Sequence, residues 1–182
     1  MKKLLTLFTL SLLPLSACTT SDLAEIGTSG LVAAESELFY DFGDINIEGG
    51  LINHSFIFTN DSEEDLVIMN LSTSCGCTAA EVMLSDGTSS PTFGMNDSSE
   101  WNKTVSAGDN FEVIVTYDPM AHGPNATGEM NRSVIMTSSS MENGRTAVFD
   151  PSTGYAFTQI NIKGMVLSAV DYLASSLEED EL

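Results

Sequence analysis

The residues with the clearest potential for chemistry are two cysteines that stand one residue apart, Cys75 and Cys77. In an extended strand, alternate side chains point to the same side about 6.6 Å apart, at a rise of ~3.3 Å per residue. A disulfide prefers a Cα separation of ~4.4–6.8 Å, so pairing these cysteines requires a local bend, for which Gly76 supplies conformational freedom. The small ring that results would be comparatively easy to reduce.

The same two cysteines also fit a metal site or a structural role. Two thiolates on one side of a strand suit a soft ion such as Cu(I) or Zn(II). Zn(II) prefers four ligands, and only His54, His122 and carboxylates could complete that set. Cu(I) accepts two thiolates and a thioether, for which the chain offers Met69, Met83, Met95 and Met120. We rank a structural role first, redox exchange with a thiol partner second and metal binding third, and we expect no resident cofactor.

Catalytic signatures are missing from the sequence. It contains no Gly-x-Ser-x-Gly elbow, no His-Glu-x-x-His and no phosphate-binding glycine loop. His54 follows the apolar alternation that includes Phe56, which is typical of a core or edge histidine. His122 falls in the turn between Pro119 and Pro124, which indicates a solvated loop residue. We therefore expect no catalytic residue and no enzymatic activity.

The charge balance excludes two classes of partner. The 182 residues carry 6 Lys+Arg against 26 Asp+Glu, a formal charge of −20. So few cations cannot form the basic patch that nucleic acid requires, and they cannot hold the chain on an anionic membrane by charge. Hydrophobic residues make up 42% of the chain, so it can bury a core of about one domain.

The N-terminus predicts membrane anchoring through a lipid. Lys2 and Lys3 precede a short apolar run, which is followed by Ser16, Ala17 and Cys18. That run is too short for a membrane-spanning helix, which needs ~20 apolar residues. The pattern resembles the lipobox of bacterial lipoproteins, which implies that Cys18 carries fatty acyl chains such as palmitate. We expect a signal peptide over residues 1–17 and a lipidated flexible tether over residues 18–37.

The lipobox resemblance also implies a location. Removal of residues 1–17 takes away two lysines and no acid, so the mature chain would carry a formal charge of −22. Its lipid would hold it in a bacterial cell envelope. Thr19 follows the anchor in place of the Asp that retains many lipoproteins at the inner membrane, so we favour the outer membrane or cell surface.

Residues 38–166 predict an all-β fold, because hydrophobic residues there alternate with a period of two. Turn-forming residues separate about seven short strands, without helices between them. The pattern indicates an immunoglobulin-like antiparallel β-sandwich. Residues 85–107 and 138–155 are predicted to be loops, the first of them long and exposed. The strands are expected at residues 38–42, 54–59, 66–71, 79–84, 111–117, 133–137 and 159–163.

The C-terminal segment, residues 167–182, predicts a short helix followed by an acidic tail. Val170, Leu173, Ala174 and Leu177 repeat with the spacing of an amphipathic helix. Four acidic residues and a leucine end the chain, which is typical of a solvated tail.

A set of short motifs, in order along the chain, resembles the bacterial envelope family called domain-of-unknown-function family 1573. SCGCT at residues 74–78 is the most specific of them. The resemblance implies an Ig-like sandwich, related to the hydin-like domains, over residues 38–166. Two departures are Ala107, where the family usually has Pro, and a longer stretch between Thr78 and Ala107. The other motifs are FYDFGDI (39–45), HSFIFTN (54–60), LVI (66–68), AG (107–108), YDP (117–119), Gly123 and INIKGMV (160–166).

Because that family has no settled activity, the resemblance implies architecture and location and no reaction. We therefore expect a non-catalytic, lipid-anchored envelope protein whose Ig-like domain binds or spaces other envelope components. Its partners would be the membrane, through the lipid, and an envelope protein or glycan, but no nucleic acid. The alternative is a lipoprotein that handles thiol redox chemistry or copper through Cys75 and Cys77.

Overall fold

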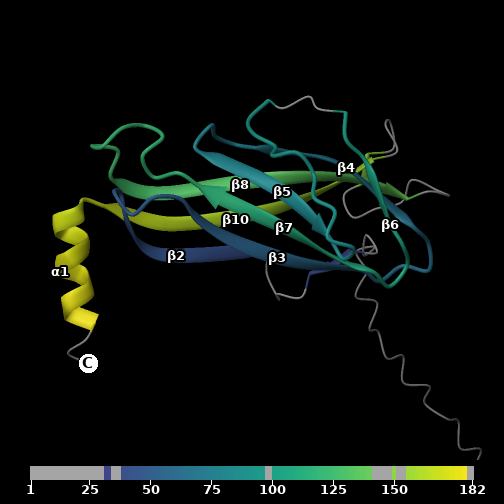
Figure 1. The fold of residues 1–182 in the computed structure, drawn as a ribbon, viewed down its shortest axis with the longest axis horizontal. Helices are drawn as coiled ribbons and strands as arrows, with labels where there is room; N and C mark the ends of the chain where they lie inside the picture. The colour runs from purple at the N-terminus through teal and green to yellow at the C-terminus, as the bar shows by residue number, and fades with distance from the viewer. Residues whose placement is uncertain (1–30, 34–37, 97–99, 141–148, 151–154, 180–182) are drawn as a thin grey trace, which may run out of the picture.

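The computed structural model describes residues 31–33, 38–96, 100–140, 149–150 and 155–179, which form two packed β-sheets and one C-terminal helix (Figure 1). Ten strands lie within these ranges. They are β1 (Leu31–Ala33), β2 (Phe39–Asn46), β3 (Ile52–Asn60), β4 (Leu66–Thr73), β5 (Thr78–Leu84), β6 (Lys103–Val105), β7 (Asn110–Tyr117), β8 (Gly128–Ser140), β9 (Phe149–Asp150) and β10 (Tyr155–Leu167), followed by helix α1 (Ala169–Glu179).

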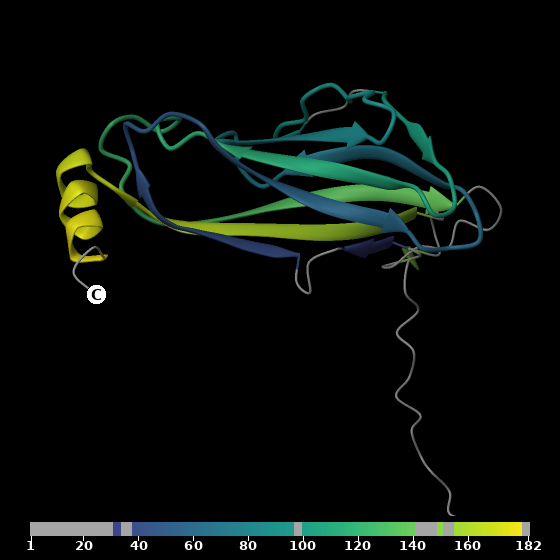
Figure 2. The same cartoon turned by 60° about the horizontal axis from the view of Figure 1, so that its bottom comes forward.

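The two sheets stack face to face, as Figure 2 shows. One sheet has the strand order β1-β3-β7-β5, and the other has the order β2-β10-β8-β4-β6, with β9 paired to β10. This arrangement confirms the predicted all-β, Ig-like sandwich. Among the described strands the pairings are antiparallel, as predicted, apart from that of β2 with β10, which is parallel. The edge strand β2 and the last strand β10 run the same way, a pairing that alternation within each strand cannot reveal.

The core lies between the sheets because alternate side chains of each strand point inward. In β7 the odd-numbered residues from Phe111 to Tyr117 are buried, and in β3 Phe56 and Phe58 are buried. The rings of Phe58 and Phe111 stack 5.2 Å apart. Each such side chain contributes roughly 1.5–3 kcal/mol through its removal from water.

Each of the seven predicted strands has a counterpart, but several are longer than expected. β8 and β10 each extend over 13 residues. β1 lies inside the segment predicted as a flexible tether, and it pairs with the end of β3. Residues 1–30, with the predicted signal peptide and Cys18, lie outside the described residues, as do 34–37.

The predicted loop over residues 85–107 is irregular and mostly exposed where it is described, but its middle is tied to β5 and its last part forms a short strand. Phe93 is fully buried, and its backbone exchanges two hydrogen bonds with Ala80 of β5. The segment ends in β6, where Val105 is buried. An edge strand left open invites pairing with other chains, and this segment covers the free edge of β5. Of the second predicted loop, 138–155, residues 138–140 belong to β8, 149–150 to β9 and 155 to β10, and the rest lie outside the described residues.

The predicted C-terminal helix is confirmed as α1. Ser168 caps it, since the Ser168 hydroxyl accepts a hydrogen bond from the Asp171 N–H at 3.2 Å and lies 2.6 Å from the Asp171 carboxylate. Ala169, Tyr172 and Ser175 are half-buried, whereas Val170, Leu173 and Leu177 face solvent. Within the ranges described above, no helix is long and apolar enough to span a bilayer.

Candidate functional site at the cysteine turn

The turn that joins β4 to β5 holds both predicted cysteines. Its base is fixed by Thr73, whose buried hydroxyl lies 2.9 Å from the Cys75 carbonyl and 3.0 Å from the Thr78 carbonyl and donates to them. The Thr78 N–H closes the turn on the Cys75 carbonyl at 3.1 Å. The turn is also tied to β8, the neighbour of β4 in the six-stranded sheet, because the N–H of Ser74 donates to the Ser133 carbonyl at 2.9 Å. Cys75 and Cys77 are therefore held on a rigid support.

Cys75 and Cys77 are joined by a disulfide, with their Cα atoms 5.2 Å apart. Cys77 is only 2% exposed, whereas Cys75 is half-buried. The bend between them does not use the left-handed conformation that glycine favours, because Gly76 is not among the residues with a positive φ. The expectation that Gly76 supplies special conformational freedom is therefore wrong.

The loop after β7 brings a histidine to the exposed sulfur. Tyr117 at the end of β7 pairs with Thr78, and the Asp118 N–H donates to the Cys77 carbonyl at 2.9 Å. This register carries the following residues alongside the turn, where His122 Nε2 lies 3.3 Å from Cys75 Sγ. His122 is exposed, as predicted for a loop residue, and it is one of the two histidines considered as a partner of the cysteines in a metal site.

A cation lies on the buried sulfur. Arg132 of β8 donates from Nε to Cys77 Sγ at 3.1 Å, and its Nη1 donates to the Asn131 carbonyl at 2.7 Å. Burial raises the pKa of the neighbouring Tyr117 hydroxyl, an effect that the positive charge of Arg132 opposes. A guanidinium beside sulfur favours the thiolate over the thiol. The two sulfurs thus have different surroundings, with imidazole at Cys75 and guanidinium at Cys77.

Three potential metal ligands meet at this turn. The sulfurs of Cys75 and Cys77 and a ring nitrogen of His122 lie within 4.8 Å of one another. Metal ligation by cysteine needs the thiolate, and in the structure the two sulfurs are bonded to each other. A metal could therefore bind only after two-electron reduction. His54, the other histidine considered as a ligand, lies elsewhere, stacked 3.6 Å from the ring of Tyr40.

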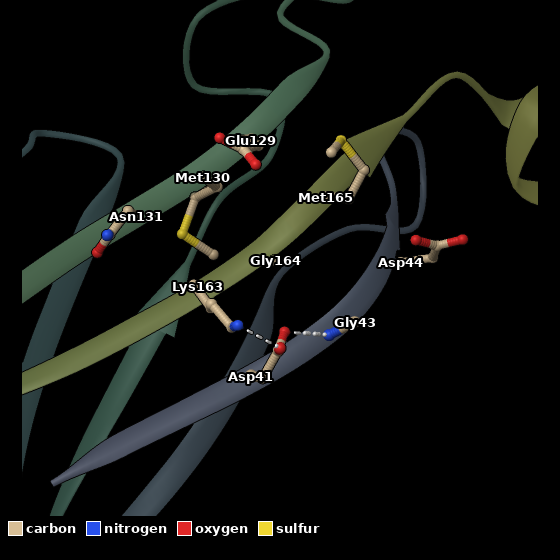
Figure 3. Close-up of a pocket in the computed structure, with 9 residues that line it drawn as sticks. All are labelled: Asp41, Gly43, Asp44, Glu129, Met130, Asn131, Lys163, Gly164 and Met165. Carbon is tan, nitrogen blue, oxygen red and sulfur yellow. Dashed lines mark hydrogen bonds and ion pairs between the residues drawn. The ribbon is translucent and has the colours of Figure 1, made fainter.

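A hollow of about 340 Å³ lies on the six-stranded sheet (Figure 3). It opens where β2 and β10 lose register, between Lys163 and Met165. Gly164 permits this close approach, because a Cβ there would lie 2.5 Å from the Ile45 side chain and 3.0 Å from the Gly43 carbonyl. The residues that line it are Asp41, Gly43, Asp44, Glu129, Met130, Asn131, Lys163, Gly164 and Met165.

Two charged groups of the hollow, those of Lys163 and Asp41, are partnered with each other. The Lys163 ammonium lies 3.0 Å from the Asp41 carboxylate and 5.2 Å from the centre of the Phe39 ring. The N–H of Gly43 donates to Asp41 at 2.9 Å, and this bond, followed by the Lys163 ion pair, lowers the pKa of Asp41. The hollow is thus explained by the β-bulge and its surface ion pair.

The sequence matches the family described as "Protein of unknown function (DUF1573)" over residues 33–87. The match includes the cysteine turn and confirms the predicted resemblance over β2 to β5. The later motifs from Ala107 to Val166 lie beyond it, and their assignment to the family stays a prediction. No curated protein matches this chain.

Solved structures with a similar fold share little sequence with this chain. The PapD-like domain 7 of human CEP192 is 10% identical, with a TM-score of 0.49 over 87% of this chain and 99% of that one. A protein of unknown function from Porphyromonas gingivalis is 11% identical, with a TM-score of 0.47 over 81% and 51% of the two chains. The Vibrio cholerae VesB protease is 13% identical, with a TM-score of 0.46 over 75% and 32%.

Proposed function

We propose that this protein is a lipid-anchored, non-catalytic component of a bacterial cell envelope, and that its sandwich binds another envelope protein through the end that carries α1. The observation that supports this proposal is the distribution of exposed apolar side chains. The four most exposed large hydrophobic residues among those described all lie at that end: Val170 at 76%, Leu177 at 69%, Leu51 at 66% and Leu173 at 62%. We call these four residues the apolar end.

An apolar stripe on a helix normally packs against its own domain. In α1 the half-buried residues contact the sandwich, and the stripe of Val170, Leu173 and Leu177 is left in water. Leu51 precedes β3 and so belongs to the turn beside α1, where the Ile47 N–H donates to the Leu167 carbonyl. Clustered exposed apolar groups on a small protein are typical of a binding surface.

The proposed anchor would lie at the opposite end. Leu31, the first residue of β1, pairs with Asn60 at the far end of β3 from Leu51. At ~3.3 Å per residue these ends are about 26 Å apart. The 13 residues from Cys18 to position 30 could extend at most ~45 Å from the membrane surface. Anchored in this way, the chain presents its apolar end away from the bilayer.

The charge around the apolar end favours a protein partner with complementary charge. α1 contains no lysine or arginine, and its first turn contains the acidic Asp171. Helices that lie on membranes are typically rich in Lys and Arg, so this helix is poorly suited to an anionic bilayer. A second copy of so acidic a chain would be repelled. An apolar groove rimmed by Lys and Arg on another envelope protein fits both features.

The binding proposal is tested by crosslinking in intact cells with the double variant Leu173→Ser/Leu177→Ser. We expect the native chain to crosslink to a partner, and the yield of crosslinked product to fall when the cells are treated at high salt. In the variant the yield should fall at least tenfold, since burial of the two leucines in the complex would contribute several kcal/mol. Ile57→Ser, which removes an exposed apolar side chain from β3, is the matched control. Equal crosslinking by the double variant would overturn the proposal.

The anchoring proposal is tested separately by Cys18→Ser. We expect the native chain in the membrane fraction, with acyl chains on its N-terminal peptide by mass spectrometry, and the variant released from that fraction. A variant that stays in the membrane fraction, or a native Cys18 without acyl mass, would show that the proposed anchor is wrong.

A further inference from the structure

We propose that the Cys75–Cys77 disulfide is a two-electron acceptor for thiol–disulfide exchange, in which an incoming thiolate attacks Cys75 and the Cys77 thiolate is released onto Arg132. The co-reactant is a dithiol, such as a cysteine pair of an envelope thiol protein. Each disulfide oxidises one dithiol and is then spent, so the reaction is stoichiometric and not catalytic. It is compatible with the proposed binding function. It does not depend on the lipid anchor or on the apolar end.

The exposure of the two sulfurs decides which one is attacked. Exchange requires a thiolate to approach a sulfur along the disulfide axis, so access is a condition for reaction. Cys77 is 2% exposed, and Cys75 is half-buried in a turn that faces solvent. Attack at Cys75 is therefore favoured, and Cys77 is the leaving sulfur.

The cation stands at the sulfur that leaves. Arg132 donates from Nε to Cys77 Sγ at 3.1 Å, which stabilises the negative charge that appears there when the disulfide breaks. A thiol whose pKa is lowered in this way leaves faster. This guanidinium comes from β8, which lies beside β4 in the six-stranded sheet, and it is 55 residues from Cys77 in sequence. It is therefore held in place before the reaction begins.

The electron pairs and protons balance over two steps. In the first, the thiolate forms a bond to Cys75 Sγ, the Cys75–Cys77 bond breaks, and its electron pair stays on Cys77. In the second step, the other thiol of the co-reactant gives its proton to water. The resulting thiolate attacks the co-reactant sulfur that is bonded to Cys75 in the mixed disulfide. The co-reactant leaves as a disulfide, and Cys75 is released as a thiolate.

The Cys75 thiolate would also be stabilised where it forms. The Cys77 N–H already donates to Cys75 Sγ at 3.2 Å, and His122 Nε2 lies 3.3 Å from the same sulfur. At this distance, His122 Nε2 is close enough to exchange a proton with Cys75 Sγ. Reduction would cost little stability, because this disulfide closes a loop with only one intervening residue.

The choice of sulfur is tested with single-cysteine variants of the full chain. Cys77→Ser leaves Cys75, and Cys75→Ser leaves Cys77, each to react with glutathione disulfide. Peptide mass spectrometry then counts the mixed disulfide at each position, independently of the state of Cys18. We expect Cys75 to react at least tenfold faster than Cys77, in line with its exposure. Equal rates, or a faster Cys77, would overturn the assignment.

The role of Arg132 is tested by the rate at which dithiothreitol reduces the native disulfide, measured by alkylation and mass spectrometry. We expect Arg132→Gln to slow reduction about tenfold through loss of the cation at the leaving thiolate. Arg132→Lys should restore most of the rate, and Lys103→Gln removes a remote charge as the matched control. An unchanged rate in Arg132→Gln, or a native disulfide that dithiothreitol does not reduce in the folded chain, would overturn the proposal.

Discussion

The cysteine turn and the hollow between β2, β8 and β10 differ in how their charged groups are used. The hollow has a volume of about 340 Å³, but its lysine is paired with Asp41 at the exposed surface. At the turn, the cation lies on one sulfur atom and the histidine lies on the other. A depression in the surface is thus a weaker guide to chemistry than the groups that converge on one reactive bond.

The largest change in the free energy of unfolding is expected from a substitution in the hollow, which tests packing there without altering the turn. Gly164→Ala places a Cβ against the Ile45 side chain and the Gly43 carbonyl, so we expect a loss of about 2 kcal/mol in the free energy of unfolding in urea. Reduction of the disulfide by dithiothreitol should keep its native rate, because the atoms that the added Cβ meets belong to Ile45 and Gly43 and not to the turn.

The matched glycine in the turn provides the control for this substitution. A Cβ at Gly76 would meet nothing within 4 Å, and its φ is not in the left-handed region. Gly76→Ala should therefore change the free energy of unfolding by less than about 0.5 kcal/mol. If Gly76→Ala costs as much as Gly164→Ala, the steric contrast between the two regions is wrong.

A smaller effect is expected at the support of the turn. Thr73→Val keeps the shape of the side chain but removes the hydroxyl that donates to the Cys75 and Thr78 carbonyls. We expect a loss of about 1–1.5 kcal/mol in the free energy of unfolding. The preference of glutathione disulfide for Cys75 over Cys77, measured in the single-cysteine variants, should fall about threefold as Cys77 becomes more accessible.

Gly164→Ala in the hollow serves as the control that separates general destabilisation from a change in the turn. Gly164→Ala is expected to destabilise the fold more than Thr73→Val does, and yet to leave the preference for Cys75 unchanged. A loss of preference in both variants would mean that the exchange reports general destabilisation and not the geometry of the turn.

The strands could be predicted because burial imposes a simple period on them. The burial of Phe111, Val113 and Val115 alternates with more exposed neighbours, and the recurrence of large hydrophobic residues at every second position is enough to place β7. Phe93 was missed because it stands in a polar, Ser- and Thr-rich segment. Its burial depends on the free edge of β5, which local composition does not reveal.

The candidate site could be predicted only in its local part. Cys75 and Cys77 are neighbours in sequence, so their proximity needs no knowledge of the fold. His122 and Arg132 reach them from 47 and 55 residues away, through the pairing of β5 with β7 and of β4 with β8. The start of a strand pairing at Thr78 and Tyr117 was the one signal that could have placed His122 beside the turn.

The smallest expected effect concerns the ion pair of the hollow. The pKa of Asp41 is lowered in the folded chain, first by the Gly43 N–H and then by Lys163. A folded pKa below the unfolded value gives stability that is present above about pH 4 and lost as the pH falls through the folded pKa. Asp41→Asn should therefore be slightly less stable than the native chain at pH 7, by urea unfolding, and equal to it in strong acid.

Asp44→Asn removes the same charge from the same hollow but leaves the Lys163 pair in place, so it is the matched control. Neither variant should alter the rate at which dithiothreitol reduces the disulfide, since the partners of Lys163 do not reach the sulfurs. A changed rate in Asp41→Asn would show that the hollow and the turn are coupled through β8 and β10. The hollow would then have to be treated as part of the exchange site and not as a packing feature of the bulge.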